Sequence, residues 1–501
     1  MQDSKAIIKK REKSEIAKYY KGLNVFITGG TDLLGKCLLE KLLRSCPQIE
    51  TMYLLVKTND GENFQNKCKK FYENNIFDIL RKHNSNLINK VNFFKGDLMQ
   101  DNLGLNNKEY KILTENVDII FHNGATTKLN EKILVALRTN VLGTQQMLDL
   151  AHNCQHLKAF VFISSCYSHY HQNIIEDKFY SAPADLNMIN DMIRTESQTG
   201  ISNETLKMLL GKWTNIYAFT KATAEDMVRH YARKSSFACC VFRPTTVIST
   251  YKEPVSGWCD IKNVPTSFFI NIAMGVIHIL FEVPGPCDLI PADLCANAII
   301  VSTWDAIHRW QIESEACVYN YGTSKVNPIT LRQIKENMMN DRNVFKTSQN
   351  NNIPVILITT NFVFYFIIRI MFDYIPAIIQ DLSTIIIGNA PKSWSLVQKS
   401  QRDIRYVHDC IVGKCWISVT DITKAYEKLN PLDRELFFCD LRTLNWGEFF
   451  VTFWHGIRLN ILQDSPNESI KKKCYKYNNK YIDFSIVILL SILVYYMIKA
   501  F

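Results

Sequence analysis

Tyr217 and Lys221 are the residues of this sequence whose types and spacing most directly suggest chemistry. They lie in the stretch NIYAFTKATAED, and on a helix two residues four apart share one face. A lysine ammonium beside a phenol favours the phenolate and lowers a tyrosine pKa of about 10 toward neutrality. Such a tyrosine can donate a proton to a carbonyl oxygen as hydride arrives at carbon. The pair alone is a weak signal, because a solvated tyrosine and lysine on a helix have the same spacing.

A pair of serines strengthens this interpretation. Ser164 and Ser165 lie in FISSCYS, directly after the strand-like run 159–163. In a parallel sheet, active residues lie at the carboxyl ends of strands. Either serine could therefore donate a hydrogen bond to the oxygen that Tyr217 protonates. The alternative is that the two serines simply form a turn.

The stretch VFITGGTDLLGK, residues 25–36, is similar to a dinucleotide-binding loop with one unusual residue, Asp32. The backbone at this position should approach a pyrophosphate closely, and a carboxylate has the wrong sign. At about 5 Å and an effective dielectric of 20, the repulsion is about 3 kcal/mol per unit charge. Alternatively, Asp32 caps the helix that begins near Leu33. We expect a weakened cofactor site.

The first half of the chain alternates short apolar runs with helical patterns. This alternation predicts an α/β fold, with a doubly wound parallel sheet and helices on both faces. The strands are expected at 24–28, 52–56, 91–94, 118–121, 159–163 and 239–242.

Composition narrows the functional class. Of 501 residues, 47% are apolar and 21% are charged, which is enough for a sizeable core. The net charge of +10 is partly local, in KKKCYK at 471–476, and does not argue for nucleic-acid binding. Fifteen scattered cysteines without framework spacing fit a reducing compartment. The N-terminus has no secretory h-region, so we expect the catalytic part to face the cytosol.

Two apolar segments suggest contact with a membrane. Residues 484–498 carry no charge, and with their flanks, 482–499, they predict a C-terminal transmembrane anchor. The uncharged run spans only about 22 Å of a roughly 30 Å hydrocarbon core, so flanking residues must extend it. The alternative is a buried terminal helix. For the apolar segment 353–380, a re-entrant or membrane-surface segment and a full span both remain open.

Longer motifs resemble the eukaryotic, insect-type fatty acyl-CoA reductases of the extended short-chain dehydrogenase/reductase superfamily. The similar stretches include VFITGGTDLLGKCLLEKLLRSCPQIETMYLLVK, CVFRPTTVISTYKEPVSGWCD, CDLIPADLCANAIIVSTW and RELFFCDLRTLNWGEFFVTFWHGIRLNIL. The resemblance covers about residues 15 to 498. It implies NADPH-dependent reduction of a long-chain acyl-CoA to the primary alcohol through a bound aldehyde, with release of CoA.

The resemblance also implies roles for individual residues. Tyr217 would be the acid, Lys221 would lower its pKa and bind the nicotinamide ribose, and Ser165 or Ser164 would be the oxyanion partner. Asn140 would support the lysine through water. Lys57 would select the 2′-phosphate of NADPH, and Asp97 would bind the adenine amine. The other implied cofactor contacts are Thr28, Gly29, Gly30, Thr31, Asp32, Leu33, Leu34, Gly35, Leu98, Asn123, Gly124, Ala125, Arg243 and Pro244; no metal is implied.

The expected organisation follows from these patterns. A polar N-terminal segment (1–20) precedes a reductase domain (21–345) that includes a substrate part (251–330). A polar linker (345–352), the apolar segment 353–380, a helical C-terminal domain (391–465) and the anchor (482–499) come next. The anchor would lie in the endoplasmic reticulum or peroxisomal membrane. Two rival functions remain: a non-catalytic, membrane-anchored dinucleotide-binding homologue weakened by Asp32, and a sterol or other lipid dehydrogenase of the same superfamily.

Removal of residues 481–501 tests the predicted anchor. If the run 484–498 is the main anchor, the shortened chain should be released from membranes by alkaline carbonate, whereas the full chain should stay in the pellet. Retention of the shortened chain after carbonate treatment would make the apolar segment 353–380 an anchor in its own right.

Overall fold

The computed structural model describes residues 13–461, except 59–60, 130, 214, 261–262, 275, 340–355 and 411–414. The expected anchor 482–499 and the linker 345–352 lie outside the described residues. The chain forms two compact units. Unit 1 comprises Met1–Asp260, Pro286–Ile329 and Gly413–Asn445; unit 2 comprises Ile261–Gly285, Thr330–Val412 and Trp446–Phe501.

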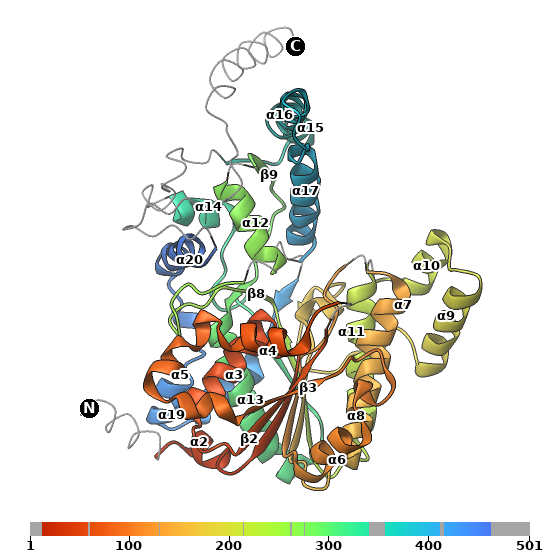
Figure 1. Cartoon of the computed structure of the whole chain (residues 1–501), viewed down its shortest axis with the longest axis vertical. Coiled ribbons are helices and arrows are strands. Elements are labelled where there is room, and N and C mark those ends of the chain that lie inside the picture. The colour runs from red at the N-terminus through yellow and green to blue at the C-terminus, as the bar shows by residue number, and fades with distance from the viewer. Residues whose placement is uncertain are drawn as a thin grey trace. The chain divides into compact units, whose positions relative to one another are not determined.

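Unit 1 is built on a seven-stranded parallel sheet (Figure 1) with the order β11-β7-β5-β4-β1-β2-β3. This order is that of a doubly wound dinucleotide-binding fold with one added strand. The predicted fold class is confirmed, and each of the six predicted strands forms. The strands are β1 Asn24–Thr28, β2 Thr51–Val56, β3 Val91–Lys95, β4 Ile119–His122, β5 Ala159–Ile163, β7 Ala238–Pro244 and the additional β11 Cys317–Tyr321.

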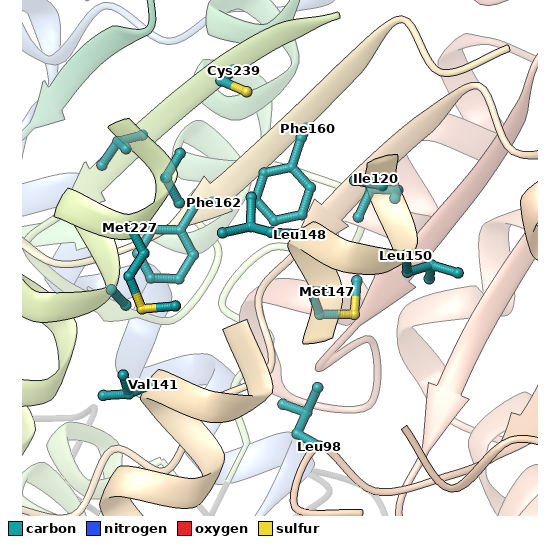
Figure 2. Close-up of a cluster of buried hydrophobic side chains, with 14 of the residues drawn as sticks. Leu98, Ile120, Val141, Met147, Leu148, Leu150, Phe160, Phe162, Met227 and Cys239 are labelled. Atoms are coloured by element: carbon teal, nitrogen blue, oxygen red, sulfur yellow. The ribbon is translucent and has the colours of Figure 1, made fainter. Parts of the chain in front are cut away.

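Helices cover both faces of this sheet (Figure 1). Helices α3 (Leu33–Ser45) and α13 (Ala292–Glu313) pack against each other on one face, and α8 (Gly143–Asn153) and α11 (Ile216–Ala232) pack on the other. Figure 2 shows the core beneath α8 and α11, where Phe160 and Phe162 of β5 meet Leu148 and Met227. Burial of these large side chains holds the sheet and helices together.

Shorter elements complete unit 1. They are α2 Glu15–Tyr19, α4 Phe64–Tyr72, η1 Asn75–Phe77, α5 Asp78–His83, η2 Ser85–Lys90, η3 Asp101–Gly104, α6 Asn107–Asn116, α7 Ile133–Ala136, η4 Leu137–Leu142, η5 Cys166–His169, β6 Ile174–Ile175, α9 Leu186–Gln198, α10 Asn203–Leu210, β8 Thr246–Ile248, β10 Leu289–Pro291, β13 Trp416–Ile417, α18 Thr420–Lys428, α19 Pro431–Leu436 and η8 Leu441–Thr443.

The end of the N-terminal segment is ordered by a distant residue. Asp433 accepts hydrogen bonds from the Ser14 hydroxyl and from the Glu15 amide at 2.9 Å. Ser14 in turn caps α2 by accepting from the Ala17 amide at 2.9 Å. Residues 14–20 are therefore part of unit 1, whereas the sequence suggested a polar segment through residue 20.

Unit 2 is mainly helical and has its own aromatic core. The Phe269 ring lies 5.3 Å from Phe453 and 6.1 Å from Phe450 between ring centres. The Asp403 carboxylate accepts from Ser267 and Asn271, which joins α17 to α12. The elements are α12 Val264–Ala273, β9 Ile279–Phe281, α14 Leu331–Met339, β12 Leu357–Thr359, α15 Phe362–Arg369, η7 Ile370–Tyr374, α16 Ile375–Ile386, α17 Ser393–Cys410 and α20 Trp446–Asn460.

The chain does not divide at the predicted domain boundaries. Strand pairing explains the difference, because β10 pairs with β8 and β13 pairs with β6. These hydrogen bonds place 286–329 and 413–445 in unit 1, while 261–285 and 446–461 belong to unit 2. The expected substrate part and the expected C-terminal domain are thus each shared between the two units.

The apolar segment of unit 2 forms a continuous helix of 25 residues, Phe362–Ile386, made of α15, η7 and α16. Its length, and the apolar composition of its most hydrophobic 18 residues, are sufficient for a membrane span. The helix begins and ends a few residues later than the apolar segment 353–380 suggested.

Candidate active site

Two loops meet where the strand order of the sheet reverses, between β1 and β4. The Thr28 hydroxyl accepts from the Gly124 amide at 2.9 Å and lies 2.8 Å from Nδ1 of His122. The Asn123 side-chain amide donates to the Gly29 carbonyl at 3.1 Å. Ligands of doubly wound sheets bind at this crevice, so the predicted residues of both loops are brought together at the expected place.

The glycines of the first loop permit close packing of backbone on backbone. A Cβ at Gly35 would lie 2.2 Å from the Gly29 carbonyl oxygen and 2.7 Å from the Gly30 Cα. Gly29 has a φ of +67°, which L side chains rarely adopt. The first N–H groups of α3 have no acceptor within the helix, and a helix N-terminus of this kind favours phosphate. The loop therefore fits a dinucleotide pyrophosphate.

Asp32 occupies the N-cap position of α3 without acting as a side-chain cap. Its backbone is extended, with φ −86° and ψ 174°, and its carboxylate makes no capping hydrogen bond to the first turn. The side chain is exposed. Because this φ is open to any residue, the loop keeps its shape with aspartate. The explanation that Asp32 caps the helix through its side chain is thus not supported.

Lys57 and Asp97, which were expected to bind different parts of the cofactor, form an ion pair at 3.0 Å. Asp97 also accepts from the Met99 amide at 3.0 Å, and 54% of the Lys57 side chain is exposed. A pair whose lysine is this exposed contributes only about 1 kcal/mol. Lys57 can therefore exchange this partner for a phosphate at little cost.

Helix α11 carries Tyr217 and Lys221 to the carboxyl end of β5. The Lys221 ammonium donates to the carbonyl of Ile163, the last residue of β5, at 2.6 Å. It also lies 4.2 Å from the centre of the Phe162 ring. Burial lowers the pKa of Lys221 to about 7, against the opposing effect of the Glu225 carboxylate. Tyr217 is half-buried one turn earlier.

The two serines after β5 have different partners. The Ser164 hydroxyl is hydrogen-bonded to the Glu225 carboxylate and lies 3.3 Å from the Ser168 hydroxyl. The Ser165 oxygen accepts from the Tyr167 amide at 3.2 Å. Ser165 thus keeps its hydroxyl proton for another acceptor, whereas Ser164 directs its own toward Glu225. This difference favours Ser165 as a donor to substrate oxygen.

A buried charge network lies behind these residues. Arg243 donates to Glu225 from Nε at 3.1 Å and from Nη2 at 2.6 Å, and His169 Nε2 lies 2.8 Å from the same carboxylate. Burial alone would raise the pKa of Glu225, but Arg243 and His169 outweigh it and hold the pKa far below its usual range. Sequence reasoning did not single out Glu225 or His169. The spacing of Glu225, four residues after Lys221, was the available signal.

Arg243, which the resemblance implies as a cofactor contact, has its side chain in a buried ion pair. Its side chain is completely buried, and Nη1 donates to the carbonyls of Glu176 at 3.3 Å and Lys178 at 3.0 Å. A buried arginine needs a carboxylate partner, and Glu225 supplies it. The guanidinium is a structural cation of unit 1. Pro244 follows it as the last residue of β7.

Asn140 connects the loop after β4 with α11. It lies in the π-helical turn η4, accepts from the Thr126 amide at 2.9 Å, and donates to the Thr220 hydroxyl at 3.0 Å. Thr220 in turn donates to the Tyr217 carbonyl at 2.9 Å. Asn140 thus fixes the backbone around the tyrosine, and π-helical turns are frequent at functional sites.

His122 is a neutral part of the same region. Burial and then the charge of Lys221 lower the pKa of His122 to about 3. Its Nε2 lies 3.0 Å from the Thr144 hydroxyl. The ring therefore links β4 to α8 without adding a second cation beside Lys221.

Residues 253–260, EPVSGWCD, hold α3 in place. Glu253 pairs with Lys41 and, at 3.0 Å, with Arg44; Asp260 pairs with Lys36 at 2.8 Å. These contacts fix the helix whose N-terminus forms the phosphate cradle.

Two family models match this chain. Both are described as male sterility protein; a nicotinamide-dinucleotide-binding model matches residues 27–299 and a second model matches residues 372–464. The chain belongs to the male sterility protein family. The resemblance inferred from the sequence is thereby confirmed, and the cofactor class is NAD or NADP.

Named relatives in this family match nearly the whole chain. "Fatty acyl-CoA reductase wat" of Drosophila melanogaster is 28% identical over 466 residues, which cover 92% of this chain and 89% of that protein. "Fatty acyl-CoA reductase 1" of Homo sapiens is 27% identical over 482 residues, which cover 95% and 92%.

Solved structures share the fold. The terminal R domain of the myxalamid PKS-NRPS pathway has a TM-score of 0.56 at 18% identity and covers 88% of this chain and 91% of that chain. The reductase domain of a nonribosomal peptide synthetase from Mycobacterium tuberculosis has a TM-score of 0.59 at 15% identity and covers 90% and 95%.

The depressed pKa of Lys221 predicts a pH dependence of stability. Lys221 has a pKa of about 7 in the folded protein against an ordinary value of 10.5, so between these values the unfolded chain binds one more proton. Relative to Lys221→Met, the wild-type free energy of unfolding should rise with pH in this window by about 1.4 kcal/mol per unit.

Denaturant unfolding of both proteins at pH 7, 8 and 9 measures this slope. Lys207→Met, at an exposed lysine of α10, is the matched control and should follow wild type. Parallel stability curves for wild type and Lys221→Met would show that Lys221 stays charged in the folded protein.

Proposed function

We propose that this protein is a membrane-anchored, NADPH-dependent fatty acyl-CoA reductase that forms primary alcohols. The observation that carries the proposal is the position of Lys221, which donates to the carbonyl of Ile163, two residues before Ser165, and lies one helical turn after Tyr217. These are the acid, its charge partner and the hydroxyl donor that carbonyl reduction needs. The names of the whole-length relatives support acyl-CoA as the substrate class.

In this proposal the nicotinamide supplies hydride, and the chain's own residues handle the proton and the developing charge. As hydride adds to the thioester carbon, Tyr217 donates its phenolic proton to the oxygen and Ser165 hydrogen-bonds the same oxygen. The resulting hemithioacetal loses CoA as the thiol when its carbon–sulfur bond breaks, which leaves an aldehyde. The alcohol would form when a second NADPH supplies a second hydride and Tyr217, reprotonated from solvent, donates a second proton.

Lys221 lowers the cost of forming the Tyr217 phenolate when it is protonated. With a pKa of about 7 in the protein without cofactor, it is poised to change charge at neutral pH. A ribose hydroxyl of the cofactor would be a further acceptor for its ammonium, which would favour the charged form.

Two finer features belong to the same proposal. Lys57 follows β2 and would pair with the 2′-phosphate of NADPH in place of Asp97; a lysine gives a point charge without the bidentate geometry of arginine. The run 482–499 would anchor the protein in the endoplasmic reticulum or peroxisomal membrane, with the reductase unit facing the cytosol. A long acyl chain and the bilayer would then be its lipid partners.

Substitution of Tyr217 tests the proposed reaction. Tyr217→Phe should abolish alcohol formation from long-chain acyl-CoA and NADPH in microsomes and leave NADPH binding nearly intact, because it removes the acid and little surface. Tyr231→Phe on the same helix, whose hydroxyl binds Asp149 at 2.8 Å, is the matched control and should retain activity. Substantial turnover by Tyr217→Phe would remove this residue from the mechanism.

Substitution of Asp32 tests whether the cofactor loop is weakened. Asp32→Gly should tighten NADPH binding, by up to about a hundredfold if the carboxylate approaches the phosphates, because it removes about 3 kcal/mol of repulsion. Calorimetric titration measures the change. Asp32→Asn keeps the approximate size and removes the charge, so similar tightening in both variants assigns the effect to charge.

The same titration tests the alternative that this protein is a non-catalytic, dinucleotide-binding homologue. The presence of Asp32 in the cofactor loop is the observation that favours this alternative. Wild type without measurable NADPH affinity, together with an Asp32→Gly variant that binds, would support that alternative. Unchanged or weaker binding in Asp32→Gly would show that the aspartate does not weaken the site.

A further inference from the structure

The helix Phe362–Ile386 buries acidic side chains and exposes apolar ones, which is the reverse of a helix on the surface of a water-soluble protein. Asp373 and Asp381 are only 2% and 9% exposed, whereas Ile378 is 46% and Ile386 is 85% exposed. A helix in water normally buries its apolar face. The exposed large apolar residues of the outward face, with the residue that follows the helix, are Phe362, Val363, Phe364, Phe366, Ile370, Ile375, Ile378, Ile379, Leu382, Ile385, Ile386 and Ile387; Ser383 is exposed as well.

The inward polar groups have specific partners, which fix the rotation of the helix. Asp381 accepts from the backbone amides of Lys392 at 3.0 Å, Ser393 at 2.8 Å and Trp394 at 2.9 Å. It therefore caps the start of α17. Asp373 is hydrogen-bonded to His278 at 3.0 Å. Turning the isoleucines inward would break these contacts.

Arg369 is held on the same helix by two phenols. Its guanidinium donates to the Tyr365 hydroxyl at 2.9 Å and to the Tyr374 hydroxyl at 2.8 Å. Its side chain is 12% exposed. The positive charge of Arg369, which interrupts the apolar sequence, is thus held away from the outward face.

The returning helix α17 argues against a full membrane span. It packs on α16 after a short turn, within the same unit. It carries exposed Lys399, Arg402 and Arg405 within its first four turns. A spanning α15–α16 helix would bring these charges into hydrocarbon, which is strongly unfavourable.

The distribution of apolar residues instead fits a helix lying in the membrane plane. Exposed apolar side chains recur from Phe362 to Ile387, over about 37 Å at 1.5 Å per residue. Trp394 is 39% exposed, and its ring lies 5.6 Å from that of Tyr374. Such aromatic residues lie at the level of lipid headgroups.

We propose that the outward face of 362–387 lies parallel to a membrane and is immersed in one leaflet, at the boundary between headgroups and acyl chains. The occupant of this face is lipid, and α17 lies on the protein side of it. This contact is additional to the expected anchor 482–499 and does not depend on the proposed reductase chemistry.

Depth measurements along the helix test the proposal. The full chain is labelled with an environment-sensitive fluorophore at Phe366→Cys, Ile378→Cys or Ile386→Cys and bound to mixed phosphatidylcholine and phosphatidylserine vesicles. Quenching by lipids with nitroxides at shallow and deep acyl positions reports depth. Because the three sites extend over about 30 Å of helix, we expect the same shallow depth at all three.

Ile312→Cys is the matched control. Ile312 lies on α13 of unit 1 and is 85% exposed, as is Ile386; its label should not be quenched. Wild-type protein labelled in parallel gives the fluorescence from labels on the native cysteines, which is subtracted from that of each variant. A cysteine variant that loses the wild-type thermal midpoint is replaced by another outward site, Ile375 or Ile385.

Three results would overturn the proposal. A label at Ile378 that is much deeper than those at Phe366 and Ile386 would indicate a transmembrane helix. Absence of quenching at all three sites, with the chain bound to vesicles, would leave the face outside the bilayer. Shielding of the three labels in a dimer formed without vesicles would assign the face to a second copy of the chain.

Discussion

The buried pair between Arg243 and Glu225 is the constraint on which the geometry of the candidate active site depends. Glu225 lies on the helix that carries Tyr217 and Lys221, and Arg243 lies at the carboxyl end of β7. A charge buried this completely is stable only if its partners are in place, and loss of one partner typically costs about 3–5 kcal/mol. The same carboxylate also binds Ser164, at the end of β5, and His169. The network therefore fixes both the position and the rotation of α11, and with them the direction of the reactive side chains.

This fixed helix brings a lysine into surroundings that disfavour its charge. Lys221 contacts a carbonyl at the sheet edge and an aromatic ring, and burial lowers its pKa to about 7. Glu225 opposes this effect, but Arg243 already neutralises much of its charge. The Glu225 carboxylate thus stabilises the fold through its pair with Arg243, while the pKa of Lys221 stays close to neutral pH. A lysine in that state can respond to a bound ligand by taking up a proton, which a lysine in a direct ion pair cannot do as readily.

The sequence predicted the features that arise from local pattern. The six strands, the glycine loop and the shared helix of Tyr217 and Lys221 follow from periodicity and spacing, and the structure has them within a few residues. Contacts between distant segments were not predictable in this way. Arg243 was expected at the cofactor from the family resemblance, and its buried ion pair with a carboxylate 18 residues earlier could not be read from local pattern. The pairing of Lys57 with Asp97 and the tie of Ser14 to Asp433 depend on tertiary proximity alone. The division into two compact units differs from the predicted domain boundaries for the same reason, since late segments pair with early ones, as β13 does with β6 in a separate two-stranded sheet.

Asp32 occupies a position where a dinucleotide-binding loop is expected to have glycine. The surrounding contacts explain why the loop keeps its shape with aspartate. The aspartate adopts an ordinary extended φ, so its backbone needs no glycine. The positions that exclude side chains, 29 and 35, are both glycine. The helix that follows is held from the outside by Lys36 with Asp260 and by Arg44 with Glu253. These pairs stabilise α3 without any contribution from a cap at residue 32. We therefore expect substitution of this aspartate to change cofactor affinity through its charge, and to leave the shape of the loop and the stability of α3 unaltered.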